Sequence, residues 1–200
     1  MPLNSNIAVG SAPATVGSLR LFTLYADFPA ALRLKWLTGQ VARLAGQRWE
    51  PRVAAWRLDS VTPAGLIKVM IAQEVGEADV LAIAMSSLDQ REPMLTEWLE
   101  SVVAWKTNGR VPGLLIGLLG DEDHQAGELD WTVNELGGFA RRTRMGFIWR
   151  WMDRDAMADA DWLVDNIETL LAEKKSASGL EPAVTAPSGE IAGKSSTAGV

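Results

Sequence analysis

Short apolar runs alternate with longer amphipathic segments through the middle of the chain. Apolar runs at 19–26, 52–58, 80–85, 113–119 and 147–152 are typical of strands. Apolar residues recur at helical spacing in segments 29–46, 93–106, 125–145 and 158–174. One further helix start is marked by Thr62 before Pro63. Five strand–helix units in succession predict a three-layer α/β fold, in which helices cover both faces of a mostly parallel sheet.

Charges within the strands predict their order. Parallel strands that are buried on both faces read as continuous apolar runs, as 80–85 and 113–119 do. Arg57 and Arg150 interrupt the second and fifth runs, which is typical of strands at a sheet edge. These edges favour the five-stranded order 2-1-3-4-5, the flavodoxin-like winding that receiver domains share. The alternative order 3-2-1-4-5 would leave the wholly apolar run 80–85 at an edge.

The two ends of the chain differ from its middle in composition. Residues 1–17 are small and polar, and residues 176–200 are rich in Ser, Ala, Gly and Pro. Such segments bury too little apolar area to offset a chain entropy of about 1–2 kcal/mol per residue. The sequence therefore predicts a single α/β domain over residues 18–175, between two disordered tails.

Composition excludes several kinds of chemistry. The 200-residue chain has a formal net charge of −6, which disfavours binding to nucleic acid. It has no cysteine, so disulfides, thiolate catalysis and Cys-ligated metals are excluded, in keeping with a reducing compartment. The first residues lack the pattern of a secretory signal, and no apolar stretch approaches the roughly 20 residues of a membrane helix. We expect a cytoplasmic protein that binds neither nucleic acid nor membrane.

Polar residues gather where the predicted strands end, which is where open α/β sheets bind ligands. The candidates along this rim are Asp27, Ser86, Ser87, Asp89, Asp121 and His124. Carboxylates from separate strands would suit Mg²⁺. Asp and Ser also stop strands and cap helices in any α/β protein, and we favour this second interpretation. We therefore predict no metal and no cofactor here, and no nucleophilic role for Ser86 or Ser87.

The motifs of common enzyme classes on this fold are missing. The sequence has no GxGxxG or GxxxxGK[ST] segment, and no GxSxG surrounds the two serines. Phosphotransfer of the receiver type needs an Asp after strand three and a Lys after strand five. Ser86-Ser87 and Met152-Asp153 stand there instead, so the likeness to receivers is one of architecture. The only histidine, His124, lies in a polar turn and reads as a solvated residue at a helix start.

Two resemblances lie in the third and fourth strand regions. The segments ADVLAIAMS, EWLESVVAW and PGLLIGLLGD together resemble an uncharacterised bacterial family of receiver-sized proteins, which implies no particular activity. Residues 78–100 are also similar to the third-strand region of nucleoside deoxyribosyltransferase-like enzymes. That resemblance implies an acidic turn at Asp89 and a nucleophile at Glu97. Trp98 follows where that family has a small residue, and its helical phase predicts that it points into the core.

The first predicted helix combines basic residues with a tryptophan beside its apolar stripe. No acidic residue occurs between Phe28 and Trp49, although the chain as a whole is acidic. A basic helix of this kind is either an ordinary solvated face or a contact surface for an acidic protein partner. The candidate contact residues are Arg33, Lys35, Trp36 and Arg43.

Two functions thus remain open. The first is a non-catalytic regulatory or protein-interaction module, which this tryptophan-rich sequence favours because it has a candidate surface and lacks catalytic motifs. The second is an enzyme on the same fold, with glycosidic-bond cleavage or Mg-assisted chemistry at the strand ends. A pocket with converging polar groups distinguishes them, since an enzyme needs one and a binding module does not.

Overall fold

A computed structural model describes residues 17–61, 66–86, 92–106, 113–120, 130–152, 157 and 159–178. Its five strands form one parallel sheet in the order β2-β1-β3-β4-β5. The strands are β1 (Gly17–Tyr25), β2 (Trp49–Arg57), β3 (Val80–Met85), β4 (Leu114–Leu119) and β5 (Gly146–Trp151). The strand order predicted from the edge charges is confirmed, and the fold is flavodoxin-like α/β.

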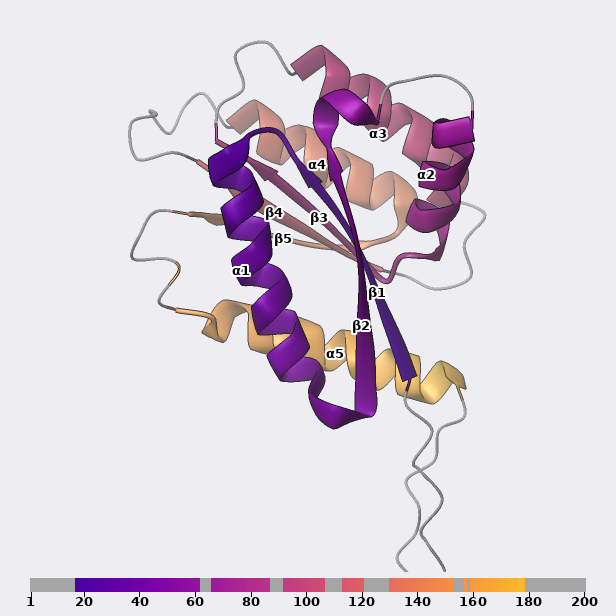
Figure 1. Ribbon diagram of the computed structural model, residues 1–200, viewed down its shortest axis with the longest axis vertical. Coiled ribbons are helices and arrows are strands. Elements are labelled where there is room, and N and C mark those ends of the chain that lie inside the picture. The colour runs from indigo at the N-terminus through magenta and orange to yellow at the C-terminus, as the bar shows by residue number, and fades with distance from the viewer. Residues whose placement is uncertain are drawn as a thin grey trace, which may run out of the picture.

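Helices cover both faces of this sheet (Figure 1). Helices α1 (Phe28–Ala45) and α5 (Asp161–Ser178) pack on one face. Helices α2 (Leu66–Glu77), α3 (Glu92–Lys106) and α4 (Asp130–Thr143) pack on the other. Two short 3-10 turns, η1 (Gly46–Arg48) and η2 (Leu58–Ser60), flank β2. No helix in these described ranges is long and apolar enough to cross a membrane.

The elements reach slightly beyond the predicted domain limits. Strand β1 begins at Gly17, and α5 continues through Ser178, so the assignment of these end residues to the tails was wrong. The helical pattern of 158–174 simply extends by one further turn, because alanine and lysine both favour helix. The helix start predicted at Thr62 and Pro63 lies outside the described residues.

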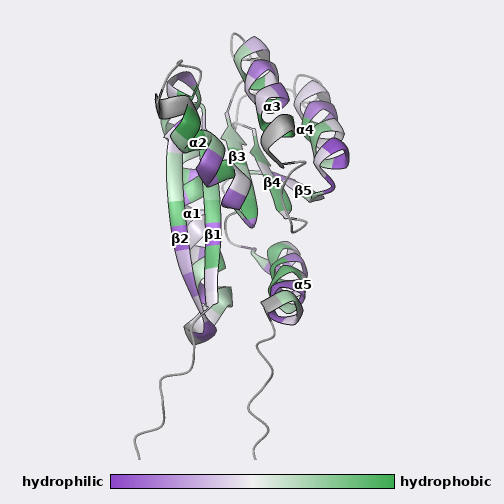
Figure 2. Cartoon of the chain, turned by 90° about the vertical axis from the view of Figure 1, so that its right-hand side faces the viewer, coloured by the Kyte–Doolittle hydropathy of each residue, from purple (hydrophilic) through white to green (hydrophobic). Residues whose placement is uncertain are grey.

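Burial explains the strand order. Every residue of β3 and of β4 is buried, whereas β2 has no fully buried residue and neither has β5. The hydropathy colours agree, because β3 and β4 are green whereas β2 also has purple segments (Figure 2). Central strands covered by helices on both sides must be apolar throughout, and only edge strands can keep a charge in water. Trp98 is 2% exposed and stacks on Phe22 with ring centroids 5.8 Å apart, so its predicted core position is confirmed.

Candidate functional site

Two of the predicted rim residues meet at the switch point between β1 and β3. Asp27 caps α1, because its Oδ1 accepts a hydrogen bond from the Ala30 N–H at 2.9 Å. The same oxygen accepts a second bond from Ser86 Oγ at 2.8 Å, and Oδ2 accepts one from the Ser86 N–H at 3.3 Å. A single carboxylate therefore joins the start of α1 to the end of β3.

Arg33 completes this network from the second turn of α1. Its Nη1 donates to Ser86 Oγ at 2.9 Å and lies 3.5 Å from the Met85 carbonyl oxygen. The side chain is only 8% exposed. The prediction that Arg33 belongs to an outer contact surface is therefore wrong. A buried guanidinium needs polar partners. Arg33 follows the buried Ala30 by one helical turn, and it finds these partners at the end of β3.

The network occupies the polar groups of Asp27 and Ser86, the two rim candidates that the structure describes. The Asp27 carboxylate already accepts three hydrogen bonds, and Arg33 supplies the positive charge nearby, so a metal cation would compete with both. Ser86 is 5% exposed, which leaves its hydroxyl little access to a substrate. Across the described residues no cluster of three or more His, Cys, Asp or Glu side chains could hold a metal ion.

The other four rim candidates lie outside the described residues, namely Ser87, Asp89, Asp121 and His124. Glu97, the nucleophile implied by the glycosyltransfer resemblance, is exposed on α3, whereas its neighbour Trp98 points into the core.

A second candidate surface lies on the outer side of α1. We define the α1 ridge as the five exposed residues at positions i, i+4, i+7, i+11 and i+15 of this helix, namely Phe28, Leu32, Lys35, Gly39 and Arg43. Phe28 is 74% exposed and Leu32 is 48% exposed. Neither cation of the ridge forms an ion pair with any residue in the described part of the chain.

The ridge differs from the predicted surface in its members. Lys35 and Arg43 are exposed as predicted, while Trp36 is half-buried and packs against the core under α1 and α5. Phe28 and Leu32 were missed. Their signal is an apolar pair four residues apart that falls out of phase with the buried stripe of Ala30, Leu34, Leu37 and Val41.

Gly39 lies in the middle of the α1 ridge, and no contact in the described part of the chain requires a glycine there. Beyond the backbone of its own helix and its chain neighbours, a Cβ atom built there would meet no atom of the described residues within 4 Å. Gly39→Ala should therefore raise the free energy of unfolding by about 0.5–1 kcal/mol, because alanine is the better helix former and nothing obstructs its methyl group. Urea denaturation of both proteins measures this difference.

Gly120→Ala is the matched comparison and should act in the opposite direction. Gly120 has φ +107°, and a Cβ there would come within 2.7 Å of the Trp151 ring. The substitution should lower the free energy of unfolding by more than 1 kcal/mol, roughly the cost of such backbone strain. Equal effects of the two alanines would contradict the placement of Gly39 on an open helix face.

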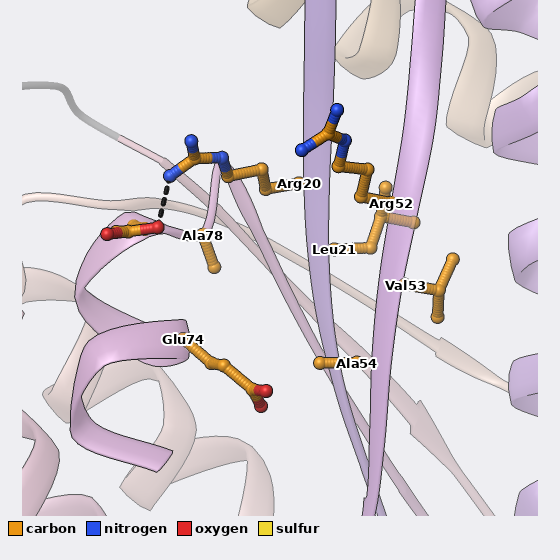
Figure 3. Close-up of a pocket in the computed structure, with 8 residues that line it drawn as sticks. Arg20, Leu21, Arg52, Val53, Ala54, Glu74 and Ala78 are labelled. Atoms are coloured by element: carbon orange, nitrogen blue, oxygen red, sulfur yellow. Dashed lines mark hydrogen bonds and ion pairs between the residues drawn. The ribbon is translucent and has the colours of Figure 1, made fainter. Parts of the chain in front are cut away.

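A groove of about 290 Å³ lies between β1, β2 and the end of α2 (Figure 3). Arg20 forms an ion pair with Glu77 across it, and Glu74 accepts a bond from Trp56 Nε1 at 2.7 Å. Arg52 pairs with Glu50 at 3.5 Å. The groove therefore carries balanced charges that already have partners, which is typical of a surface depression that fixes α2 to the sheet edge.

Comparison with known proteins assigns no function to the chain. No family model and no curated protein matches the chain. Among solved structures, the flavodiiron protein from Giardia intestinalis is similar, with a TM-score of 0.49 and 15% sequence identity over 80% of this chain. The match covers 37% of that protein, so this chain spans well under half of its length. No residue role is carried over from it.

Proposed function

We propose that this chain is a non-catalytic protein-interaction module that binds an acidic protein segment through the α1 ridge. One observation carries the proposal: a phenylalanine that is 74% exposed stands on the same helix face as Lys35 and Arg43. Burying a Phe or Leu side chain contributes about 1.5–3 kcal/mol, so a partner that covers Phe28 and Leu32 gains appreciable affinity.

The charge of the ridge determines the kind of partner. Helix α1 has no acidic residue, and Lys35 and Arg43 are about 12 Å apart along its axis at 1.5 Å per residue. In a chain of net charge −6, this face is where an acidic segment meets attraction rather than repulsion. An amphipathic acidic helix, with its apolar side toward Phe28 and Leu32, suits both features.

The closed network at the strand ends supports the non-catalytic part of the proposal. Ser86 is hydrogen-bonded to both Asp27 and Arg33, so the polar groups of these three side chains already have partners. A ligand at this point would have to displace a buried guanidinium from its hydroxyl partner, which is costly.

Fluorescence anisotropy tests the proposal with a synthetic peptide. The probe is an amphipathic helix with glutamates on one side and leucines on the other, and its matched control replaces every Glu by Gln. Binding of the Glu peptide should weaken about tenfold in the Lys35→Glu/Arg43→Glu variant, because about 1.4 kcal/mol is lost when attraction becomes repulsion. The Gln peptide should bind more weakly to wild type and should not distinguish the variant.

A second variant controls for nonspecific apolar binding. Val69→Ser/Met70→Ser removes two exposed apolar side chains from α2, which are 65% and 54% exposed on the opposite face. It should bind the Glu peptide as wild type does, whereas Phe28→Ser/Leu32→Ser should weaken binding. Equal losses in the two apolar variants would show that the peptide adheres to any exposed apolar surface, and the proposal would fail.

A further inference from the structure

Helix α5 presents an acidic ridge on the same side of the molecule as the α1 ridge. Asp161, Asp165, Glu168 and Ala172 stand at positions i, i+4, i+7 and i+11, and all four are exposed. We name these residues the α5 ridge. Its three acids form no ion pair with any side chain in the described ranges. Helices α1 and α5 lie on the same face of the sheet, so the basic α1 ridge and the acidic α5 ridge belong to one layer of the molecule (Figure 1).

The two ridges also match in length and spacing. Each helix has 18 residues. Arg43 follows Lys35 by eight positions, a rise of about 12 Å, and Glu168 follows Asp161 by seven positions, a rise of about 10.5 Å. Half-buried Val164 and Leu171 line one flank of the α5 ridge, which offers apolar contacts to Phe28 and Leu32. The α5 ridge has the chemistry that the α1 ridge requires of a partner.

We propose that the acidic segment bound by the α1 ridge is the α5 ridge of a second copy of this chain, so that the protein forms a symmetric dimer. This inference rests on the proposed function, since it uses the same ridge. In a two-fold dimer each copy contributes one α1 ridge and one α5 ridge, so the same contact forms twice. Both ridges are exposed, and no ion pair joins them within one copy in the described part of the chain.

Gly39 supplies an independent reason for close helix contact. Glycine inside a helix costs about 1 kcal/mol relative to alanine, and no contact with the rest of the described chain requires a glycine at this position. A helix that crosses at Gly39 can approach more closely than one that meets a side chain, because helix separation depends on the residues at the contact. Ala172 on the α5 ridge is also small, and both residues lie on the ridges that carry the charges that would pair.

Sedimentation velocity on the full chain tests the dimer. At low salt, and between about 5 and 500 µM, the mass should rise from the chain mass of 21.7 kDa toward twice that value. In about 1 M salt, where the Debye length is only about 3 Å, the dimer should dissociate more readily. A chain that stays monomeric throughout this range at low salt would overturn the inference.

Two charge-reversal variants identify the surfaces. Lys35→Glu/Arg43→Glu should be monomeric because two acidic ridges then meet, and Asp165→Lys/Glu168→Lys should be monomeric because two basic ridges meet. An equimolar mixture should form a heterodimer, since each α1 ridge then faces an α5 ridge of opposite charge. Arg52→Glu/Arg141→Glu makes the same change in net charge elsewhere and should dimerise as wild type does. The assignment of the two ridges as the dimer surface would be contradicted if the two variants stayed monomeric when mixed. It would also be contradicted if both variants dimerised as wild type does.

Gly39→Gln distinguishes an effect on the dimer contact from an effect on the stability of the monomer. It should raise the melting temperature of the monomer and yet weaken the dimer about tenfold, because the new side chain occupies the crossing point. A dimer unaffected by this variant would place the contact away from Gly39. Peptide binding is measured far below the dimerisation range, so a monomeric chain that still binds the Glu peptide would refute the second copy and leave the proposed function standing.

Discussion

Asp27→Ala should lower the free energy of unfolding by about 3 kcal/mol. Loss of a helix cap costs about 1 kcal/mol, and the two donors of Ser86 lose their acceptor at a further cost of about 1–3 kcal/mol. The buried Arg33 also loses the nearby negative charge, because its partner Ser86 is hydrogen-bonded to the Asp27 carboxylate. Urea denaturation measures the change, and circular dichroism shows whether the variant still folds.

Companion variants separate the cap from the network. Asp27→Asn keeps the capping oxygen while removing the charge, so it should cost less than Asp27→Ala. Arg33→Met replaces the buried cation by an apolar chain of similar size, and Asp27→Ala should cost less in that background, because no buried charge is left unpaired. Strictly additive effects, or a cost for Asp27→Ala of only about 1 kcal/mol, would show that Asp27 acts as a cap alone.

Trp98→Ala should have the other large effect, a loss of about 4 kcal/mol. Removing a buried aromatic side chain typically costs about 3–5 kcal/mol, and the stacking on Phe22 adds to the loss. Trp98→Phe should cost much less. It keeps an aromatic ring in the site and removes an indole N–H that has no hydrogen-bond partner among the described residues.

Glu97→Gln is the control on the same helix. Its side chain is exposed, so the substitution should change the free energy of unfolding by less than about 0.5 kcal/mol. Thermal and urea denaturation of the three variants measure these differences. A Trp98→Ala variant as stable as Glu97→Gln would contradict the core position of Trp98 and would reopen a functional role for this helix.

The strand order could be predicted because the burial of a strand restricts which residue types it contains. Val80–Met85 and Leu114–Leu119 are apolar at every position, and helices cover them on both sides. Arg57 and Arg150 are tolerated only because β2 and β5 have one open edge. These signals are local, so they need no knowledge of tertiary contacts.

The strand-end network could be predicted only in part, because its members come from distant parts of the chain. Asp27 and Ser86 were expected at the same rim from the ends of their strands, although 59 residues separate them. Arg33 was assigned to the surface because charged side chains are usually exposed. Its burial depends on a hydroxyl 53 residues away, which no helical pattern contains. Phe28 and Leu32 were overlooked because only apolar residues in phase with the stripe were counted.

Amide chemical-shift mapping of the labelled chain with the Glu peptide tests the central claim most directly. It reports on both candidate surfaces in one titration, through Gly39 on the α1 ridge and through Ser86 and Gly120 at the strand ends. We predict that amides of residues 28–43 shift along the ridge, with Gly39 among the largest changes, while Ser86 and Gly120 stay in place. Shifts at Ser86 and Gly120 with an unchanged Gly39 would contradict the account, because the strand ends would then be the surface that binds.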